Sequence, residues 1–106
     1  MSDIYAREKF DAAVEVLATS PETIQERLNF AYLTFHPVQI RDFSDPEDAA
    51  LYIAILEALT TVKNGDPDQG YVKNTLAVMS AEKASKVADD IVALRNRLEA
   101  KRLRAA

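Results

Sequence analysis

Apolar residues recur along this chain at helical spacing, and this pattern predicts an all-α protein. A first stripe recurs at intervals of three or four residues: Ala6, Phe10, Ala13, Val14 and Leu17. Such spacing places side chains on one face of a helix, so we expect a helix from Asp3 to Leu17 or Ala18, capped by Ser2 or Asp3. No segment shows the sustained apolar–polar alternation of a half-exposed strand.

The sequence TSPE predicts the start of a second helix. Ser20 is a suitable cap, Pro21 suits the first helical position, and Glu22 favours the positive N-terminal end of the helix dipole. The apolar stripe of this helix has the same spacing as the first: Ile24, Leu28, Ala31, Tyr32 and Phe35. Pro37 ends the helix, because proline disfavours helical geometry at the residue before it.

The sequence SDPED predicts a third helix, from Pro46 to about Lys63. Between Ala50 and Leu59 this helix is apolar nearly all round. A helix without a polar face is normally surrounded by other helices, so we expect it at the centre of the fold.

Two further helices follow, and they complete the predicted bundle. Residues 71–79 predict a short fourth helix, and Ser80 caps a fifth from about Ala81 to Leu103. The stripe of the fifth helix alternates spacings of three and four over about two heptads: Ala84, Val87, Ile91, Leu94 and Leu98. We therefore expect one domain over residues 1–106, a compact bundle of four or five helices with a long amphipathic C-terminal helix.

The sequence NGDPDQGY, residues 64–71, carries oxygen-bearing side chains at alternate positions, as the start of a calcium loop does. Neither possible register has the glycine at position 6 or the glutamate at position 12 that such a loop requires. Turn chemistry explains the residues instead. We expect Gly65 to end the third helix, Asp66 and Pro67 to start a turn, and Asp68 to cap the fourth helix. No metal site is predicted.

Composition narrows the functional classes. The chain has no cysteine, which excludes thiol catalysis, zinc-thiolate sites and disulfides. Its longest apolar-dominated run is residues 49–59, too short for a bilayer span of about 20 residues, and its N-terminus does not resemble a secretory signal. We expect a cytoplasmic protein without a membrane segment. No phosphate-binding loop or nucleophile elbow is present, so we predict no cofactor and no enzymatic activity.

Charge is unevenly distributed in this chain of net charge −4. Residues 1–53 hold four Lys/Arg and ten Asp/Glu, whereas residues 54–106 hold nine and seven. Together with the heptad-like stripe, this asymmetry favours binding to a protein partner or to a second copy. The candidate partner-binding residues lie on the fifth helix: Val87, Ile91, Leu94, Leu98, Arg95 and Arg102. The same stripe can instead close the bundle within one chain, and we favour this monomer over a homodimer.

Two alternative functions remain open. The basic residues Arg95, Arg97, Lys101, Arg102 and Arg104 favour a nucleic-acid-binding accessory protein, but no aromatic residue follows Tyr71, and an acidic protein repels phosphates. The only histidine, His36, lies near Tyr32 and Tyr52 in a region rich in aromatics, which is consistent with a small-molecule site or an enzyme.

Adjacent acidic residues do not indicate a paired-carboxylate site. Neighbouring positions on a helix diverge by roughly 100°, so Glu47 and Asp48 do not share a proton or a metal ion. We expect these carboxylates to be solvated, at the capped start of the third helix.

Overall fold

The structure is a computed structural model that describes residues 3–105. These residues form five α-helices and one 3-10 helix: α1 (Asp3–Thr19), α2 (Ile24–Phe35), η1 (Ile40–Asp42), α3 (Pro46–Ala58), α4 (Tyr71–Ala77) and α5 (Ala81–Ala105). The predicted all-α bundle with a long C-terminal helix is confirmed. The alternative cap at Ser2 lies outside the described residues. Within residues 3–105, no helix combines the length and apolar character needed to cross a membrane.

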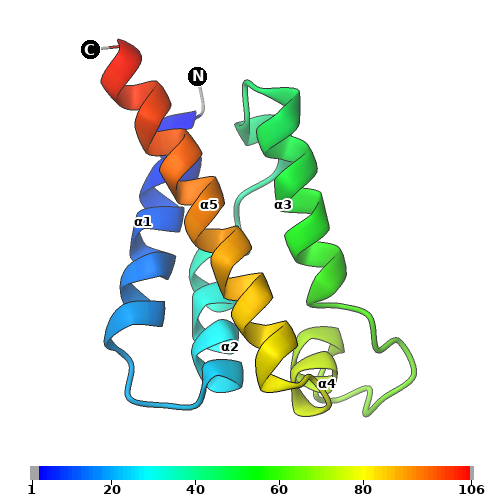
Figure 1. The fold of residues 1–106 in the computed structure, drawn as a ribbon. Helices are drawn as coiled ribbons and strands as arrows, with labels where there is room; N and C mark the ends of the chain where they lie inside the picture. The colour runs from blue at the N-terminus through cyan, green and yellow to red at the C-terminus, as the bar shows by residue number, and fades with distance from the viewer. Residues whose placement is uncertain (1–2, 106) are drawn as a thin grey trace.

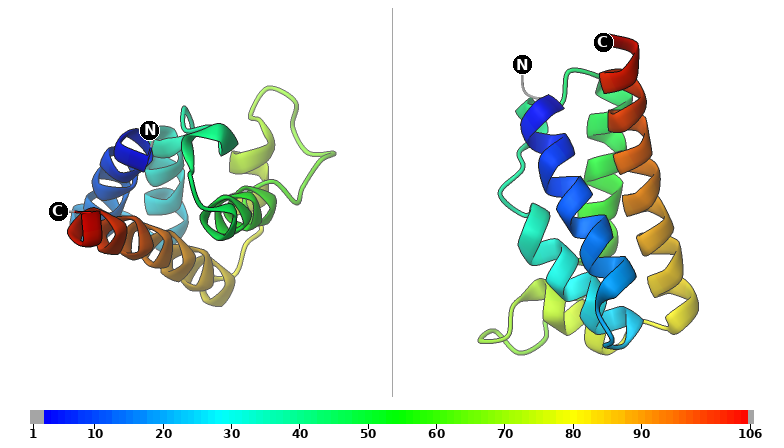
Figure 2. Two further views of the ribbon diagram at one scale, coloured as in Figure 1. Left: turned by 90° about the horizontal axis from the view of Figure 1, so that it is seen from above. Right: turned by 90° about the vertical axis from the view of Figure 1, so that its left-hand side faces the viewer.

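The four longer helices lie side by side, and α5 runs obliquely across the bundle (Figure 1). Helix α1 packs against α2 and α5, and α3 packs against α5 and η1. Seen from above, α1 and α3 lie on opposite sides of the bundle (Figure 2). The short helix α4 lies at the end of the bundle where α2 and α5 begin, and it contacts α2. The connection between α3 and α4 projects outward there.

Three aromatic rings, one each from α1, α2 and α3, pack together in the core. Phe10 and Phe35 stack with their ring centroids 4.8 Å apart, and Tyr52 packs edge-on against both rings. The Tyr52 hydroxyl donates a hydrogen bond of 2.6 Å to the backbone carbonyl of Val38. This contact satisfies a buried polar group and joins α3 to the segment that follows α2.

Helix α5, and not α3, crosses the core, so the expected central position of α3 is wrong. The apolar stripe of α5 is completely buried, and α5 packs against α1, α2 and α3. Helix α3 instead leaves Ala50, Ile53 and Ala54 exposed, with 37% of Ile53 accessible. Two of these three residues are alanines, whose small side chains expose little apolar area to water.

Two helix boundaries differ from the predictions by three residues or more, and in both places hydrogen bonds other than the expected ones form. Helix α2 is capped by Thr23, whose hydroxyl accepts from the Glu26 amide and donates to the Glu26 carboxylate, each at 3.2 Å. This pair replaces the expected cap at Ser20. Helix α3 ends at Ala58, before the predicted Lys63, and the Val62 amide donates to the Thr75 hydroxyl instead.

Candidate functional site

The apolar stripe of α5 is buried within the chain. Four predicted partner-binding residues are at most 1% exposed: Val87, Ile91, Leu94 and Leu98. They pack in the same core as residues of α1, α2 and α3. The stripe closes the bundle within one chain, which leaves these side chains almost no surface to offer to a partner.

Basic residues of α5 pair with the acidic start of α3, in what we call the α3–α5 ion cluster: Asp45, Glu47, Asp48, Arg97 and Lys101. Arg97 donates from Nε to Asp48 and from Nη2 to Glu47, at 3.1 Å for the second contact. The Lys101 Nζ lies 2.5 Å from Asp48 Oδ2 and 2.8 Å from Asp45 Oδ2. Asp48 is completely buried, so its expected solvation is wrong. Two cations from another helix compensate its burial.

The charges of this cluster shift one another's protonation equilibria. A hydrogen bond from Lys101 is the main cause of the lowered pKa of Asp45. Burial opposes the raised pKa of Lys101, but its hydrogen bonds to Asp45 and Asp48 outweigh that effect. The cluster therefore favours the charged forms of Asp45 and Lys101 and holds α3 against α5.

The other predicted basic residues of α5 lie outside this cluster. Arg102 pairs with Glu99 one turn earlier, and this hydrogen bond raises the pKa of Arg102. Arg95 is half-buried, and its Nε atom has no hydrogen-bond partner among the described residues. Two of the five candidate phosphate-binding cations, Arg97 and Lys101, are thus engaged by carboxylates from α3.

The three candidate ligand residues do not form a shared pocket. His36 is exposed, and its ring lies 5.6 Å from the half-buried ring of Tyr32. Tyr52 is 1% exposed and is hydrogen-bonded to Val38 in the core. Burial raises the pKa of Tyr52 to about 12, with a smaller contribution from Tyr32 and Asp42. These contacts explain Tyr52 as a structural residue.

The NGDPDQGY segment forms the predicted turn, although two of its residues have other roles than expected. The Asp66 side chain accepts from the Asp68 amide at 3.0 Å, and the Asp66 backbone carbonyl accepts from the Gln69 backbone amide at 3.2 Å. Gly65 does not end α3, and Asp68 does not cap α4; the cap is Gly70, with a φ of 90°. Within residues 3–105, no group of three or more His, Cys, Asp or Glu side chains is placed to hold a metal ion.

Asn74 of α4 holds this turn in place. Its side-chain amide donates to the Asp66 carbonyl at 2.8 Å, and its oxygen accepts from Gln69 at 2.7 Å. A β-carbon at Gly65 would come within 2.6 Å of the Asn74 side chain, so this close approach requires glycine. The turn is thereby fastened to α4, and Gln69 and Tyr71 are positioned beside α2.

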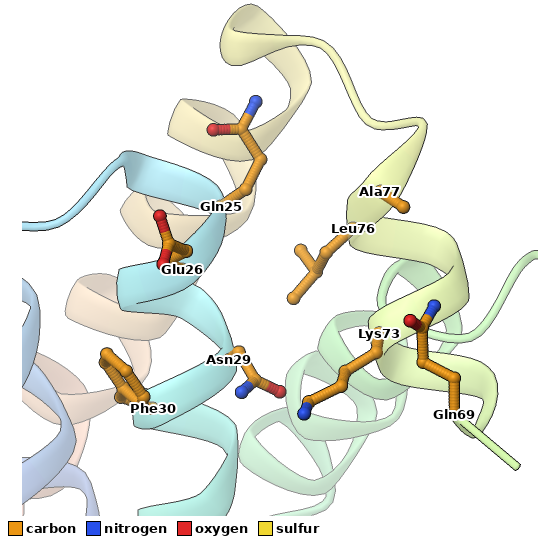
Figure 3. Close-up of a pocket in the computed structure, with 8 residues that line it drawn as sticks. All are labelled: Gln25, Glu26, Asn29, Phe30, Gln69, Lys73, Leu76 and Ala77. Carbon is orange, nitrogen blue, oxygen red and sulfur yellow. The ribbon is translucent and has the colours of Figure 1, made fainter.

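A hollow of about 370 Å³ lies between α2 and α4 (Figure 3). Asn29 of α2 and Lys73 of α4 point toward each other across it, and Leu76 points into the space between the two helices. Glu26 and Phe30 also belong to α2, and the Phe30 ring lies on the side of this helix away from Lys73 and Leu76. The hollow is thus bounded by two elements that are distant in sequence.

A second hollow, of about 280 Å³, adjoins the first and shares Asn29, Gln69 and Lys73 with it. Leu33 lines it from α2, and Tyr71 lines it from α4. We call the two hollows together the α2–α4 groove. Three large apolar side chains of the groove are well exposed: Phe30 at 42%, Leu33 at 54% and Tyr71 at 54%.

The α2–α4 groove combines a buried apolar base with a polar border. Leu76 and Val72 line it and are less than 10% exposed, and Glu26 and Lys73 provide opposite charges on the two sides. Within residues 3–105, Lys73 forms no ion pair with another residue. Apolar surface with a few polar groups around it is the usual form of a recognition site in proteins.

The sequence contained only part of the signal for this groove. Phe30 and Leu33 lie outside the buried stripe of α2, where a surface helix normally carries polar residues, so an exposed apolar pair was visible in the pattern. Nothing in the pattern indicated that α4 would lie beside them. Comparison with protein-family models, with curated proteins and with solved structures gives no significant match for this chain.

Proposed function

We propose that this chain is a non-enzymatic interaction module that binds a segment of a partner protein in the α2–α4 groove. The observation that carries the proposal is the exposure of Phe30, Leu33 and Tyr71 around the two adjoining hollows of the groove. Exposed aromatic side chains beside a hollow are frequent anchors of protein interfaces, since a partner that covers them removes apolar area from water.

Other surfaces of the molecule offer less support for a function. The α3–α5 ion cluster engages Arg97 and Lys101 and so reduces the positive potential that a nucleic acid would require. His36 is exposed and lines neither hollow of the groove. A binding site for protein at the α2–α4 groove is therefore preferred to nucleic-acid binding or to catalysis at His36.

The proposal is tested by isolating the protein from its native host with its bound partners. A Phe30→Lys, Leu33→Glu double variant places charges at the groove, and Leu103→Lys is the matched control because Leu103 is 61% exposed on α5, away from the groove. Circular dichroism and thermal unfolding establish that both variants remain folded.

We expect at least one protein to copurify with the wild type and with Leu103→Lys but not with the double variant. Quantitative mass spectrometry of the three preparations measures this difference. Identical sets of copurified proteins for wild type and double variant would contradict the proposed function.

A further inference from the structure

We propose that the occupant of the α2–α4 groove is an amphipathic helix of another protein, with basic residues on its flank nearest Glu26 and acidic residues on its flank nearest Lys73. This inference rests on the proposed function, because it specifies the partner of the same groove. Four features support it: the dimensions of the groove, the state of its backbone, the amount of exposed apolar area, and the position of its charges.

The dimensions of the groove match about two helical turns. Glu26, Phe30 and Leu33 are spaced i, i+4 and i+7 along α2, which corresponds to about 10 Å at 1.5 Å per residue. Helix α4 spans seven residues and has a similar length. A partner helix of this length presents apolar side chains at i, i+3 or i+4, and i+7 on one face.

The backbone of both walls favours a helix over an extended segment. The walls are mostly α-helical, so their amides and carbonyls are largely paired within α2 and α4 and offer no sheet edge for strand addition. A segment laid on Leu76, Phe30 and Tyr71 must satisfy its own backbone polar groups or lose their hydration. A helix satisfies these groups internally and directs its side chains into the groove.

The exposed apolar area is too small for two whole domains to form a stable dimer here. Aromatic side chains present about 150–250 Å² each, so the exposed parts of Phe30 and Tyr71 together amount to about 200 Å². A standard interface buries about 800 Å² per partner, of which about 450 Å² is apolar. A second copy also lacks a free amphipathic helix, because the apolar stripes of α1, α2 and α5 are buried in its own core.

The charges on the two sides of the groove define the flanks of the partner helix. Figure 3 shows Glu26 on the α2 side and Lys73 on the α4 side of the same hollow. A helix lying between them gains from a basic residue near Glu26 and an acidic residue near Lys73. The reversed arrangement places like charges together, so these two residues set the orientation of the bound helix.

The test selects peptides from a displayed library of random 16-residue sequences on the wild-type protein, with counter-selection on Phe30→Lys. Enriched peptides are synthesised, and their affinities are measured by fluorescence anisotropy for the wild type, Phe30→Lys, Glu26→Lys, Lys73→Glu and the control Leu103→Lys. Circular dichroism of each complex reports the helicity of the bound peptide.

We expect enriched peptides to carry large apolar residues at i, i+3 or i+4, and i+7, and to gain helicity on binding. Phe30→Lys should weaken binding about tenfold or more, and Leu103→Lys should leave it unchanged. Glu26→Lys should weaken binding about two- to fivefold, as expected for a rim charge. Replacing the basic flank of the peptide with glutamate should reverse that loss.

Several outcomes separate this inference from the proposed function. An extended bound form of peptides that depend on Phe30 would overturn the helical occupant. An unchanged affinity for both Glu26→Lys and Lys73→Glu would overturn the proposed flanks. In either case the groove would still be a protein-binding site. Concentration-dependent sedimentation abolished by Phe30→Lys would assign the groove to a second copy. Failure to enrich any Phe30-dependent peptide would overturn the inference, while the copurification experiment still tests the groove independently.

Discussion

Asn74 fills the space beside Gly65, with its Cγ atom 2.6 Å from the position that a β-carbon at Gly65 would take. The same Asn74 side chain holds Asp66 and Gln69 by hydrogen bonds, so the turn and one wall of the α2–α4 groove depend on a single residue. Gly65 therefore leaves room for the Asn74 side chain, whereas the sequence predicted that it would end α3.

We expect Gly65→Ala to lower the free energy of unfolding by about 1–3 kcal/mol, because the new methyl group displaces Asn74 from its hydrogen bonds. In an Asn74→Ala background the same substitution should cost less, since the side chain that it meets is then absent. Urea unfolding of the two single variants and the double variant measures the coupling.

Gly70→Ala is the matched control for this cycle. Gly70 has a φ of 90°, and a β-carbon there would meet no atom within 4 Å, so its cost comes from backbone strain of about 1–2 kcal/mol. That cost should be equal with and without Asn74. If Gly65→Ala lowers the free energy of unfolding equally in both backgrounds, the close approach to Asn74 does not cause the loss.

The α3–α5 ion cluster should show strong non-additivity. Arg97→Met and Lys101→Met each leave Asp48 with one cationic partner, whereas the double variant leaves a buried carboxylate unpaired. The double variant should therefore lose more stability than the two single variants combined. Chemical denaturation of the four proteins at pH 7 measures this coupling energy, and strict additivity would contradict the pairing of Asp48 with both cations.

Tyr52 should make stability fall in alkaline solution. Its pKa is about 12 in the folded chain and about 10 when unfolded, so above pH 10 the unfolded state releases the proton first. The raised pKa of Tyr52 contributes about 2–3 kcal/mol to the free energy of unfolding. This contribution is complete below pH 10 and is lost as pH rises through 12. Unfolding by urea between pH 9 and pH 11.5 should show a steeper decline for the wild type than for Tyr52→Phe.

The comparison with Tyr52→Phe isolates this residue, because lysine side chains titrate in the same range in both proteins. Tyr52→Phe also removes the hydrogen bond to Val38, which should lower stability by about 1 kcal/mol at neutral pH. Parallel pH profiles for the two proteins would show that Tyr52 ionises as easily in the folded chain as in the unfolded one.

Ile91 distinguishes the two interpretations of the α5 stripe. Since Ile91 is completely buried in the core of one chain, Ile91→Ala should lower the free energy of unfolding by about 2–5 kcal/mol. The thermal midpoint should be the same at 5 μM and at 500 μM for wild type and variant, as for a monomer. A midpoint that rises with protein concentration would indicate an interface between copies.

Local sequence patterns were sufficient to predict most helices and one complete stripe. The spacing of Phe10 and Leu17 placed α1 correctly, and the stripe of α5 was identified residue by residue. Such features depend on contacts within a few residues, where helical periodicity relates sequence directly to position on a face. The turn at Asp66 and Pro67 was predictable for the same reason, because its hydrogen bonds join neighbouring residues.

Long-range partners decided the remaining features. Asp48 is buried because Arg97 and Lys101 reach it from positions 49 and 53 residues later in the chain, and no local pattern specifies that meeting. Likewise, α4 lies beside Phe30 and Leu33 only after the bundle has assembled, so the α2–α4 groove could not be predicted from the sequence. Periodicity in this sequence determined which faces are apolar, whereas packing between distant helices determined which of those faces remain open to a partner.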